Sequence, residues 1–331
     1  MKKIMNRPDE AVRDMIEGMR LANPDIRILP GTSVIVRKDA PVAGKVGIIS
    51  GGGSGHEPAH GGFVGKGMLD AACAGDVFTS PSVDQMVKAI RAVDAGRGVL
   101  IIAKNYTGDN LNFDMAMELL EEEGIKTAKV KVHDDTAVEE SSDTTGRRGV
   151  AGTMLVQKVA CACAEAGGSL EEVQEAAQNA ADNVRTIGFA LSPCIIPAVG
   201  KPGFFLGDEE MELGTGIHGE AGIRRMKVDT AHNLAKIMLE KLLADMPVEK
   251  GEEICVLVNG MGSTPLMELY ILYREVHMAL EEKEIRIAKA YVGEYMTSLE
   301  MAGASVSIMK LDERRKRFLL APADTAGFRQ F

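Results

Sequence analysis

The first half of the chain alternates between buried-strand patterns and helix patterns, and this alternation constrains the fold more than any other feature. Lys45–Ser50, Val99–Lys104 and Lys126–Val132 are apolar runs of strand length. Apolar residues at helical spacing separate them over Ser82–Val93 and Asn112–Glu123. Strands that alternate with helices over short loops form βαβ units. The sequence therefore predicts an α/β fold whose first sheet is largely parallel and flanked by helices.

The change in pattern near Arg185 predicts a domain boundary. A polar segment over 133–149 and two further helix patterns lead up to it, and a Gly/Pro-rich region follows. A chain of 331 residues is long for one ordinary domain and comfortable for two. We therefore expect two α/β domains, an N-terminal one over 1–185 and a C-terminal one over 186–331.

The second domain begins with a hairpin pattern and continues as a second α/β set. Phe204–Leu206 and Met211–Leu213 flank a polar turn and predict two paired strands. The elements expected after them are a helix at Thr230–Ala244, a strand at Glu253–Val258, a helix at Pro265–Glu281, a strand at Ile285–Val292 and only short elements to the end.

The composition excludes several classes of partner. The net charge is −10, so neither nucleic acid nor an anionic membrane surface would be attracted to the chain. Aromatic residues make up 4% and Trp is absent, which argues against platforms for base stacking. We expect no nucleic-acid partner.

The cysteines and the apolar segments predict a cytoplasmic protein. The five cysteines form no CxxC pair and lie mostly in apolar runs, as reduced core residues do. Pro8 interrupts the N-terminus before an apolar signal region develops. No stretch approaches the roughly 18 apolar residues that a membrane span needs. We expect no membrane partner.

A glycine-rich run follows the first predicted strand and is the richest candidate site. Gly51–Gly55 holds four glycines and Ser54, and His56 follows directly. Such glycines let backbone N–H groups approach phosphate or hydroxyl oxygens closely. Neither the P-loop nor the dinucleotide-binding spacing is present, and His56 stands where the elbow of a serine hydrolase needs glycine. A tight turn alone explains two glycines, so we expect the stretch Gly51–His60 to approach a ligand.

A second candidate loop follows the strand that ends at Lys104, and it carries Asp109. Ligands of open parallel sheets bind at the carboxyl ends of strands, so we expect Lys104 and Asp109 to share a pocket with His56. An Asx turn beside Gly108 is the simpler explanation of Asp109 alone, and a solvated strand end is that of Lys104. Lys104 is also able to form a Schiff base, which leaves a sugar-phosphate aldolase as an alternative.

The third candidate is His218, which lies among the glycines of Gly214–Gly219. A lone histidine is usually a surface or structural residue, but glycines on both sides indicate a backbone that exposes the ring. His133 precedes Asp134 and Asp135, yet adjacent side chains on a strand point in different directions, so no metal site is predicted. The remaining histidines lack such a setting: His60, His133, His232 and His277. His232 and His277 lie within predicted helices, and we expect both to be structural.

Several long, separated motifs together resemble the substrate-binding K subunits of dihydroxyacetone kinases. They extend through both predicted domains and are specific to that family. The motifs are Ala43-Gly44-Lys45, Gly51-Gly52-Gly53-Ser54-Gly55-His56-Glu57-Pro58, Phe78-Thr79-Ser80-Pro81, Lys104-Asn105-Tyr106-Thr107-Gly108-Asp109, Gly146-Arg147-Arg148-Gly149, Gly216-Ile217-His218-Gly219-Glu220 and Thr264-Pro265-Leu266-Met267-Glu268-Leu269-Tyr270.

The resemblance implies a kinase subunit that forms a homodimer and captures dihydroxyacetone covalently. It implies a hemiaminal between His218 and the ketone carbon, with His56 and Asp109 as further catalytic residues that assist proton transfer. The substrate contacts implied are Gly53, Ser54, Gly55, His56, Lys104, Asp109 and His218.

The resemblance also implies partners. This chain would bind no cofactor, whereas ADP or ATP with Mg would sit on a separate L subunit. In bacteria a phosphotransferase-system protein, the M subunit, commonly recharges that L subunit. Relatives that sense dihydroxyacetone without phosphorylating it leave a non-catalytic coactivator as the alternative, and erythrulose or another short ketose is the alternative substrate. The presence of His56, Asp109 and His218 together favours the enzyme.

Overall fold

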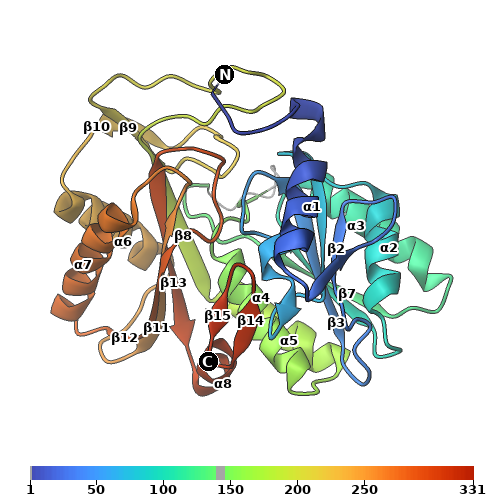
Figure 1. Ribbon diagram of the computed structural model, residues 1–331. Helices are drawn as coiled ribbons and strands as arrows, with labels where there is room; N and C mark the ends of the chain where they lie inside the picture. Colours follow the sequence, from blue (N-terminus) through green and yellow to red (C-terminus); the bar gives the residue numbers. More distant parts are fainter. Residues whose placement is uncertain (1, 139–145) are drawn as a thin grey trace.

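The computed structural model describes residues 2–138 and 146–331, in which two six-stranded sheets stand side by side with helices around them (Figure 1). Residues 26–132 supply the first sheet and residues 184–311 the second. The predicted α/β fold is confirmed. Residues 139–145 of the polar segment predicted over 133–149 lie outside the described residues.

The first sheet has the strand order β1-β2-β5-β3-β6-β7. Strands β5, β3, β6 and β7 pair in parallel, whereas β1 and β2 pair antiparallel at one edge, so the predicted largely parallel sheet is confirmed. Strand β3 continues past the predicted end at Ser50 and through the glycines, because it pairs there with β5. The bounds are β1 (Ile26–Ile28), β2 (Val34–Arg37), β3 (Gly47–Ser54), β5 (Ala71–Val77), β6 (Val99–Lys104) and β7 (Thr127–Val132).

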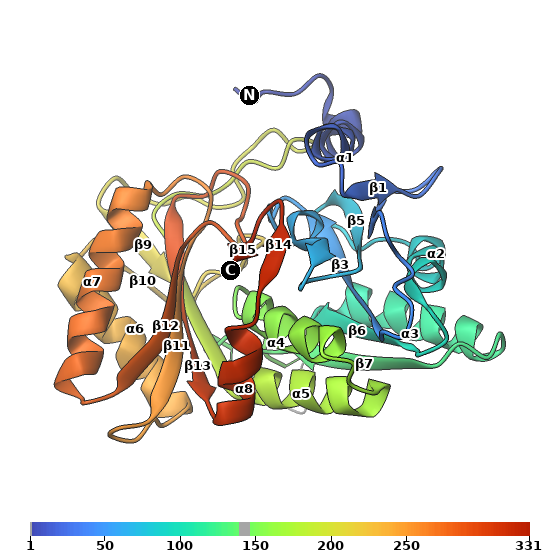
Figure 2. The same cartoon turned by 60° about the horizontal axis from the view of Figure 1, so that its bottom comes forward.

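Helices cover both faces of this sheet. Ile101 of β6 packs with α2 and α3, while Ile102 packs with α4 and α5. Successive side chains of a strand point to opposite faces of the sheet, so both faces are buried here. Helix α1 follows the short η1 (Pro8–Glu10) and packs against β1 and β5 (Figure 2). The bounds are α1 (Ala11–Ala22), α2 (Val83–Val93), α3 (Thr107–Glu121), α4 (Thr153–Glu165) and α5 (Leu170–Asp182).

Helix α3 begins earlier than the predicted start at Asn112. Gly108 favours a turn in the sequence, but the chain leaves β6 through Tyr106 in an extended conformation and becomes helical at Thr107. Asp109 therefore lies in the first helical turn, where the helix dipole favours a carboxylate. Asp109 thus lies at a helix N-terminus and not in the Asx turn that was its simpler explanation.

The second sheet has the strand order β10-β9-β8-β13-β11-β12, and only β11 and β12 pair in parallel. Helices α6 (Ala231–Asp245) and α7 (Leu266–Glu282) pack on its outer face against Val256 and Ile308. The predicted helices and the strands β11 and β12 are confirmed. The strand bounds are β8 (Val184–Ala190), β9 (Glu210–Leu213), β10 (Arg224–Lys227), β11 (Glu253–Gly260), β12 (Arg286–Gly293) and β13 (Gly303–Leu311).

The predicted hairpin pairs the wrong segments. β9 contains Met211–Leu213, but its partner is β10, not Phe204–Leu206. Phe205 is 78% exposed, so its apolar side chain does not indicate a buried strand. The real hairpin encloses residues 214–223, and His218 lies in this connection. Because two paired strands anchor this connection, the position of His218 is fixed.

The longest strand of the second sheet, β13, is absent from the prediction, which expects only short elements after Val292. Its alternation of small polar and apolar residues, such as Ser305 with Val306, is weaker than that of the predicted strands. Strand β13 nevertheless lies in the middle of the sheet, between β8 and β11. Pairing on both sides compensates for the weak local signal.

The molecule is a stack of five layers (Figures 1 and 2). The order is α2 and α3, the first sheet, α4 and α5 with α8 (Glu313–Leu319), the second sheet, and α6 and α7. The largest core cluster joins Leu155 and Ala177 of the middle helices to Ile102 of the first sheet and Leu257 of the second. The two sheets thus share one apolar core across the central helices.

The C-terminal segment returns to the first half of the chain. β14 (Ala323–Thr325) pairs with β15 (Arg329–Gln330) and with β4 (Gly65–Lys66), which follows η2 (Gly61–Phe63). Arg185, at the predicted boundary, lies inside β8. The division into 1–185 and 186–331 stays a prediction.

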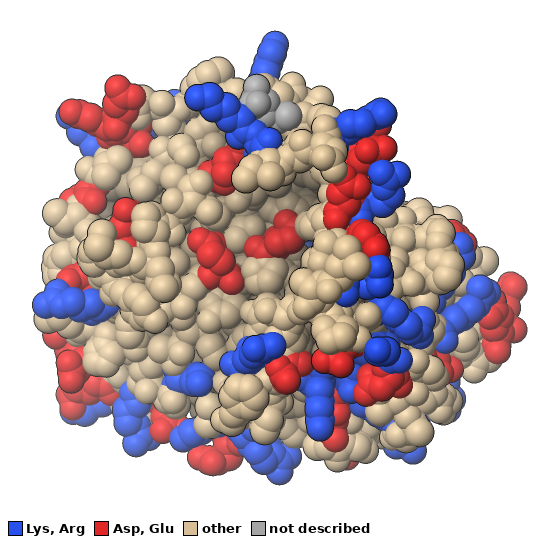
Figure 3. All heavy atoms as spheres, in the orientation of Figure 1, with Lys and Arg blue, Asp and Glu red and all other residues tan. Residues whose placement is uncertain are grey.

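The surface and the cysteines bear on the predictions from composition. The face in Figure 3 shows Lys and Arg intermingled with Asp and Glu along its lower rim, and acidic side chains in a hollow near its centre. All five cysteines are free and buried, as expected of core residues. Among the described residues, none of the helices combines the length and the apolar character that crossing a bilayer requires.

Candidate active site

Two of the predicted histidines meet between the sheets. His56 follows the end of β3, His218 lies between β9 and β10, and 162 residues separate them in the sequence. Their Nε2 atoms are 3.1 Å apart. The parallel strand β3 and the β9–β10 hairpin therefore build one site from both halves of the chain.

His56 is held by the segment between β12 and β13. Its Nδ1–H donates to the carbonyl oxygen of Thr297 at 2.8 Å, and the backbone N–H of Leu299 donates to the carbonyl of Gly55 at 2.8 Å. The ring is fully buried, and burial, reinforced by the charges of His218 and Lys104, lowers the pKa of His56 well below 6.5. His56 is therefore a neutral ring with its Nε2 lone pair toward His218.

His218 is oriented by Glu220, two residues later. Its Nδ1–H donates to Oε1 and its backbone N–H to Oε2, both at 2.9 Å. Burial alone would raise the pKa of Glu220, but the hydrogen bond and charge of His218 and the guanidinium of Arg148 lower it to about 2. The group is thus a carboxylate that only accepts hydrogen bonds. Arg148 is fixed in turn by Asp135, to which its Nε–H donates at 2.7 Å.

The contact between the two Nε2 atoms has a consequence for their protons. Thr297 and Glu220 offer only acceptors, so both Nδ1 atoms carry hydrogen and both Nε2 atoms are lone pairs in the neutral rings. In the neutral pair the two Nε2 lone pairs therefore face each other at 3.1 Å, and neither ring donates to the other. Each Nε2 lone pair is available to a ligand.

Aromatic rings enclose the pair. Phe78 stacks on His56 with ring centroids 5.1 Å apart and meets His218 edge-on at 5.0 Å, while Tyr106 meets His218 edge-on at 4.7 Å. Phe78 has φ of 57°, uncommon for a residue with a side chain. A Cβ on Gly53 would lie 2.6 Å from Cα of Phe78, so glycine is required where the two segments cross. These contacts restrict rotation of the His218 ring.

Lys104 and Asp109 meet at the glycine-rich strand. Lys104 ends β6 and is fully buried, and Asp109 is 4% exposed. A Cβ on Gly52 would lie 2.6 Å from Lys104 Nζ and 3.3 Å from Asp109 Oδ2, so both groups point at the same glycine. Burial lowers the pKa of Lys104, and Asp109 opposes that shift. Among the described residues Asp109 Oδ1 is buried without a hydrogen-bond partner, as an acceptor awaiting a ligand hydroxyl would be.

Two other residues predicted to contact a substrate, Ser54 and Gly55, form hydrogen bonds within the chain. Ser54 Oγ–H donates to the carbonyl of Gly75 at 2.7 Å and not to a histidine that would activate it, so the serine-hydrolase alternative gains no support. Gly55 N–H donates to Glu57 Oε1 at 3.1 Å. The roles of Gly53, Ser54 and Gly55 as substrate contacts stay predictions.

Sequence reasoning missed two polar groups of the site. Glu220 stands in the His218 motif, and its spacing of two residues was the available signal for a carboxylate that orients the ring. His60 lacks the glycine setting that singled out His218 and was not chosen, but its Nε2 lies 2.9 Å from Lys104 Nζ, so it belongs to the surroundings of the site. Among the described residues no group of three or more His, Cys, Asp or Glu side chains is arranged to hold a metal ion.

Known proteins resemble the chain over nearly its whole length. The Dak1 domain matches residues 17–327. A Listeria innocua protein named PTS-dependent dihydroxyacetone kinase 1, dihydroxyacetone-binding subunit DhaK, is 52% identical over 330 residues, 99% of this chain and 100% of the relative. The Escherichia coli protein named PEP-dependent dihydroxyacetone kinase, dihydroxyacetone-binding subunit DhaK, is 40% identical over 349 residues, 98% of each chain.

Solved structures agree with these relatives. The native dihydroxyacetone kinase of C. freundii matches with a TM-score of 0.90 at 37% identity over 99% of this chain, which spans 60% of that longer one. The dihydroxyacetone kinase operon co-activator Dha-DhaQ matches with a TM-score of 0.89 at 36% identity over 98% of each chain. The resemblance seen in the motifs is confirmed: the chain belongs to the Dak1 domain family.

Proposed function

We propose that the chain is the dihydroxyacetone-binding subunit of a dihydroxyacetone kinase and captures the ketose as a hemiaminal on Nε2 of His218. The observation that carries the proposal is the contact of 3.1 Å between the Nε2 atoms of His56 and His218, with both Nδ1 atoms engaged elsewhere. A ring that donates through Nδ1 is nucleophilic at Nε2. Membership of the Dak1 family supports the substrate class, since both bacterial relatives are named dihydroxyacetone-binding subunits.

The capture step balances in protons and charge. The Nε2 lone pair of His218 forms a bond to the ketone carbon. The π electrons of the carbonyl move to its oxygen, which takes up a proton from solvent and becomes a hydroxyl that can donate to the Nε2 lone pair of His56. The proton taken up leaves one positive charge on the alkylated His218 ring, beside the carboxylate of Glu220 at 2.9 Å.

Covalent capture selects a ketose over a triol. Glycerol offers nearly the same hydroxyls as dihydroxyacetone but has no carbonyl for Nε2 of His218 to attack. Hydrogen bonds alone discriminate poorly between such small molecules, whereas an adduct also fixes a flexible ketose in one orientation. Phe78 and Tyr106 restrict rotation of the His218 ring, so a ketose bonded to that ring has a fixed orientation as well.

Asp109 and Lys104 suit the hydroxyl that receives the phosphoryl group. Asp109 Oδ1 is buried and has no partner among the described residues, so it can accept the proton of the attacking hydroxyl. The ammonium of Lys104 lies on the same side of Gly52 and supports the hydroxyl oxygen and the charge near it. In this assignment Lys104 contacts the substrate in the pocket and forms no covalent bond to it. The aldolase alternative would regain support only if borohydride trapped the substrate on Lys104.

The phosphoryl donor is proposed to lie on a partner. ADP or ATP with Mg would be held by a separate L subunit, recharged by the M subunit of the phosphotransferase system, while this chain binds no cofactor. The names of the relatives from Listeria innocua and Lactococcus lactis, which call their kinases PTS-dependent, support this division. We further propose a cytoplasmic homodimer.

A second function has specific support. The co-activator Dha-DhaQ has the same fold over 98% of both chains, so a protein that binds the ketose and regulates without turnover is the rival. Both functions use the same capture chemistry at His218. Asp109, whose free Oδ1 serves phosphoryl transfer and not capture, favours the kinase.

Turnover with a partner separates the two. The chain is mixed with a nucleotide-loaded L subunit of a phosphotransferase-dependent relative, dihydroxyacetone is added, and the ketose phosphate is assayed. The kinase proposal predicts sustained product that depends on both proteins. Tight ketose binding without product would overturn it in favour of the regulator. Erythrulose in a parallel assay decides how narrow the substrate class is.

A further inference from the structure

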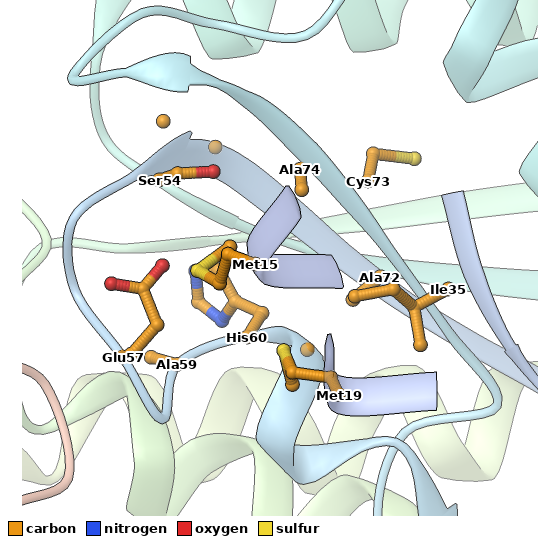
Figure 4. A pocket seen from close by; sticks show the side chains of 13 residues that line it. Met15, Met19, Ile35, Ser54, Glu57, Ala59, His60, Ala72, Cys73 and Ala74 are labelled. Atoms are coloured by element: carbon orange, nitrogen blue, oxygen red, sulfur yellow. The ribbon is translucent and has the colours of Figure 1, made fainter. Parts of the chain in front are cut away.

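His60 lies at the N-terminus of η2, directly behind the catalytic groups. The residue is 6% exposed, and it lines a small pocket with Met15 and Met19 of α1 (Figure 4). Figure 4 also shows Glu57 and Ser54 around the same pocket. The apolar side chains of α1 cover the ring on the side away from the sheet and limit its access to water.

A chain of buried polar contacts runs through His60. Its Nε2 lies 2.9 Å from Lys104 Nζ. On the other side, its Nδ1 lies 2.9 Å from the Gln157 side-chain amide and 3.4 Å from Ser50 Oγ. Ser50 is anchored in turn, because its Oγ–H donates to the carbonyl of Ile102 at 2.7 Å. Three elements, β3, β6 and α4, thus converge on one ring.

The ring is an acceptor for lysine. Burial, reinforced by the charge of Lys104, lowers the pKa of His60 well below 6.5, so the ring is neutral. An ammonium group only donates, and therefore a charged Lys104 requires the lone pair at Nε2 and the hydrogen at Nδ1 of His60. The Gln157 nitrogen faces Nδ1 and donates to Ser50 Oγ at 3.0 Å, while its Oε1 is without a partner among the described residues. Rotation of the amide would give up the contact with Ser50 and turn Oε1 toward Nδ1–H as its acceptor.

We propose that His60 is a positioning residue for Lys104: it accepts a hydrogen bond from the ammonium through Nε2 and holds Nζ at the corner between Gly52 and Asp109. Lys104 has a flexible side chain, and among the described residues no other hydrogen bond fixes Nζ, so without His60 its ammonium would be free to bind Asp109. Held by His60, the ammonium leaves Asp109 Oδ1 open for the substrate hydroxyl. A buried donor left unpaired is unfavourable, so replacing the ring with an apolar group forces Lys104 to move.

The inference rests on the proposed function and predicts a split between two steps. Capture of the ketose occurs at His218, whereas Lys104 and Asp109 act on the hydroxyl that is phosphorylated. Loss of His60 should therefore slow phosphoryl transfer and spare the adduct. Removal of a group that orients a catalytic residue typically costs about 10- to 100-fold.

The experiment compares His60→Met, which removes the acceptor, with His60→Gln, whose amide oxygen can replace Nε2. Adduct mass and kcat with the L subunit are measured for each. We expect His60→Met to form the adduct but to lose about 10- to 100-fold in kcat, and His60→Gln to recover most of the loss. In a Lys104→Met background, His60→Met should have little further effect, since its partner is already gone. The exposed His277→Met is the matched control and should behave as wild type.

The outcomes separate this inference from the proposed function. Wild-type protein without adduct or product refutes the function. Wild-type turnover with equal kcat in His60→Met, or with additive losses in the double variant, refutes the role of His60. If His60→Met does not fold, the ¹⁵N NMR shifts of the His60 ring decide. They should report an acceptor Nε2 in wild type and a change in Lys104→Met, and identical shifts in both proteins would overturn the contact.

Discussion

Nε2 of His218 faces Nε2 of His56 at 3.1 Å, while Glu220 and Thr297 occupy the two Nδ1 atoms. In both rings this arrangement leaves Nε2 as the nitrogen with an available lone pair. It joins a strand of the first sheet to a hairpin of the second, so the chemistry depends on the two halves being packed together. The predictions below follow from this geometry.

His218→Ala should abolish covalent retention of dihydroxyacetone. The variant lacks the only nucleophile that the account assigns to the ketone carbon, while the surrounding Phe78 and Tyr106 rings remain. Intact-protein mass spectrometry after incubation with dihydroxyacetone measures the adduct, with the exposed His277→Ala as control. An undiminished adduct in His218→Ala would refute the role.

Asp109→Asn should separate capture from transfer. The amide is nearly isosteric but no longer accepts a proton, so the adduct on His218 should form while kcat with the L subunit falls by about 10²- to 10⁴-fold. Asp114→Asn, on the exposed face of the same helix, is the control. Equal losses of adduct and turnover in Asp109→Asn would show that the two steps do not divide between these residues.

Gly52→Ala should disable the site through a single methyl group. Its Cβ would lie 2.6 Å from Lys104 Nζ, and Gly52 has φ of 155°, which residues with side chains rarely adopt. We expect turnover to drop at least about 10-fold because Lys104 and Asp109 must both shift. Gly18→Ala in α1 has open space around its Cβ and should leave turnover unchanged. Wild-type kinetics in Gly52→Ala would contradict the placement of Lys104.

Stability should decline on acidification below about pH 6.5. Burial lowers the folded-state pKa of both His56 and His60, whereas the unfolded chain binds protons on these rings near pH 6.5. The stabilisation is thus complete above the unfolded pKa and is lost as the pH falls toward the folded pKa. Each ring contributes a slope of up to about 1.4 kcal/mol per pH unit in the free energy of unfolding.

Urea unfolding between about pH 7.5 and about pH 5.5 measures this slope. His60→Gln has no titratable ring at this position and should give a shallower dependence than wild type. The exposed His277→Gln should leave the slope unchanged. A steeper slope in His60→Gln would mean that the buried ring is protonated in the folded protein.

The elements around the site could be predicted where local patterns are strong. The apolar run of β6 and the helical spacing of α2 are local signals, and both elements form as expected. Strand β13 was not predicted, because its stability comes from pairing with β8 and β11, which are distant in sequence. The start of α3 at Thr107 was missed because Gly108 weakens the helix pattern locally.

The site residues divide in the same way. His56, Lys104, Asp109 and His218 stand in motifs with unusual local sequence and could be singled out. His60 has no such signal, since its importance comes from Lys104 on another strand and Gln157 on a helix. Contacts between distant segments decide a buried polar network, and one sequence does not reveal them.

A crystal structure with bound dihydroxyacetone tests directly whether His218 captures the ketose covalently. Crystals soaked with dihydroxyacetone should show continuous density from Nε2 of His218 to a tetrahedral carbon, with a ligand hydroxyl at Asp109 Oδ1. A His218 ring turned away from the ketose, or density joined to Lys104 instead, would contradict the account.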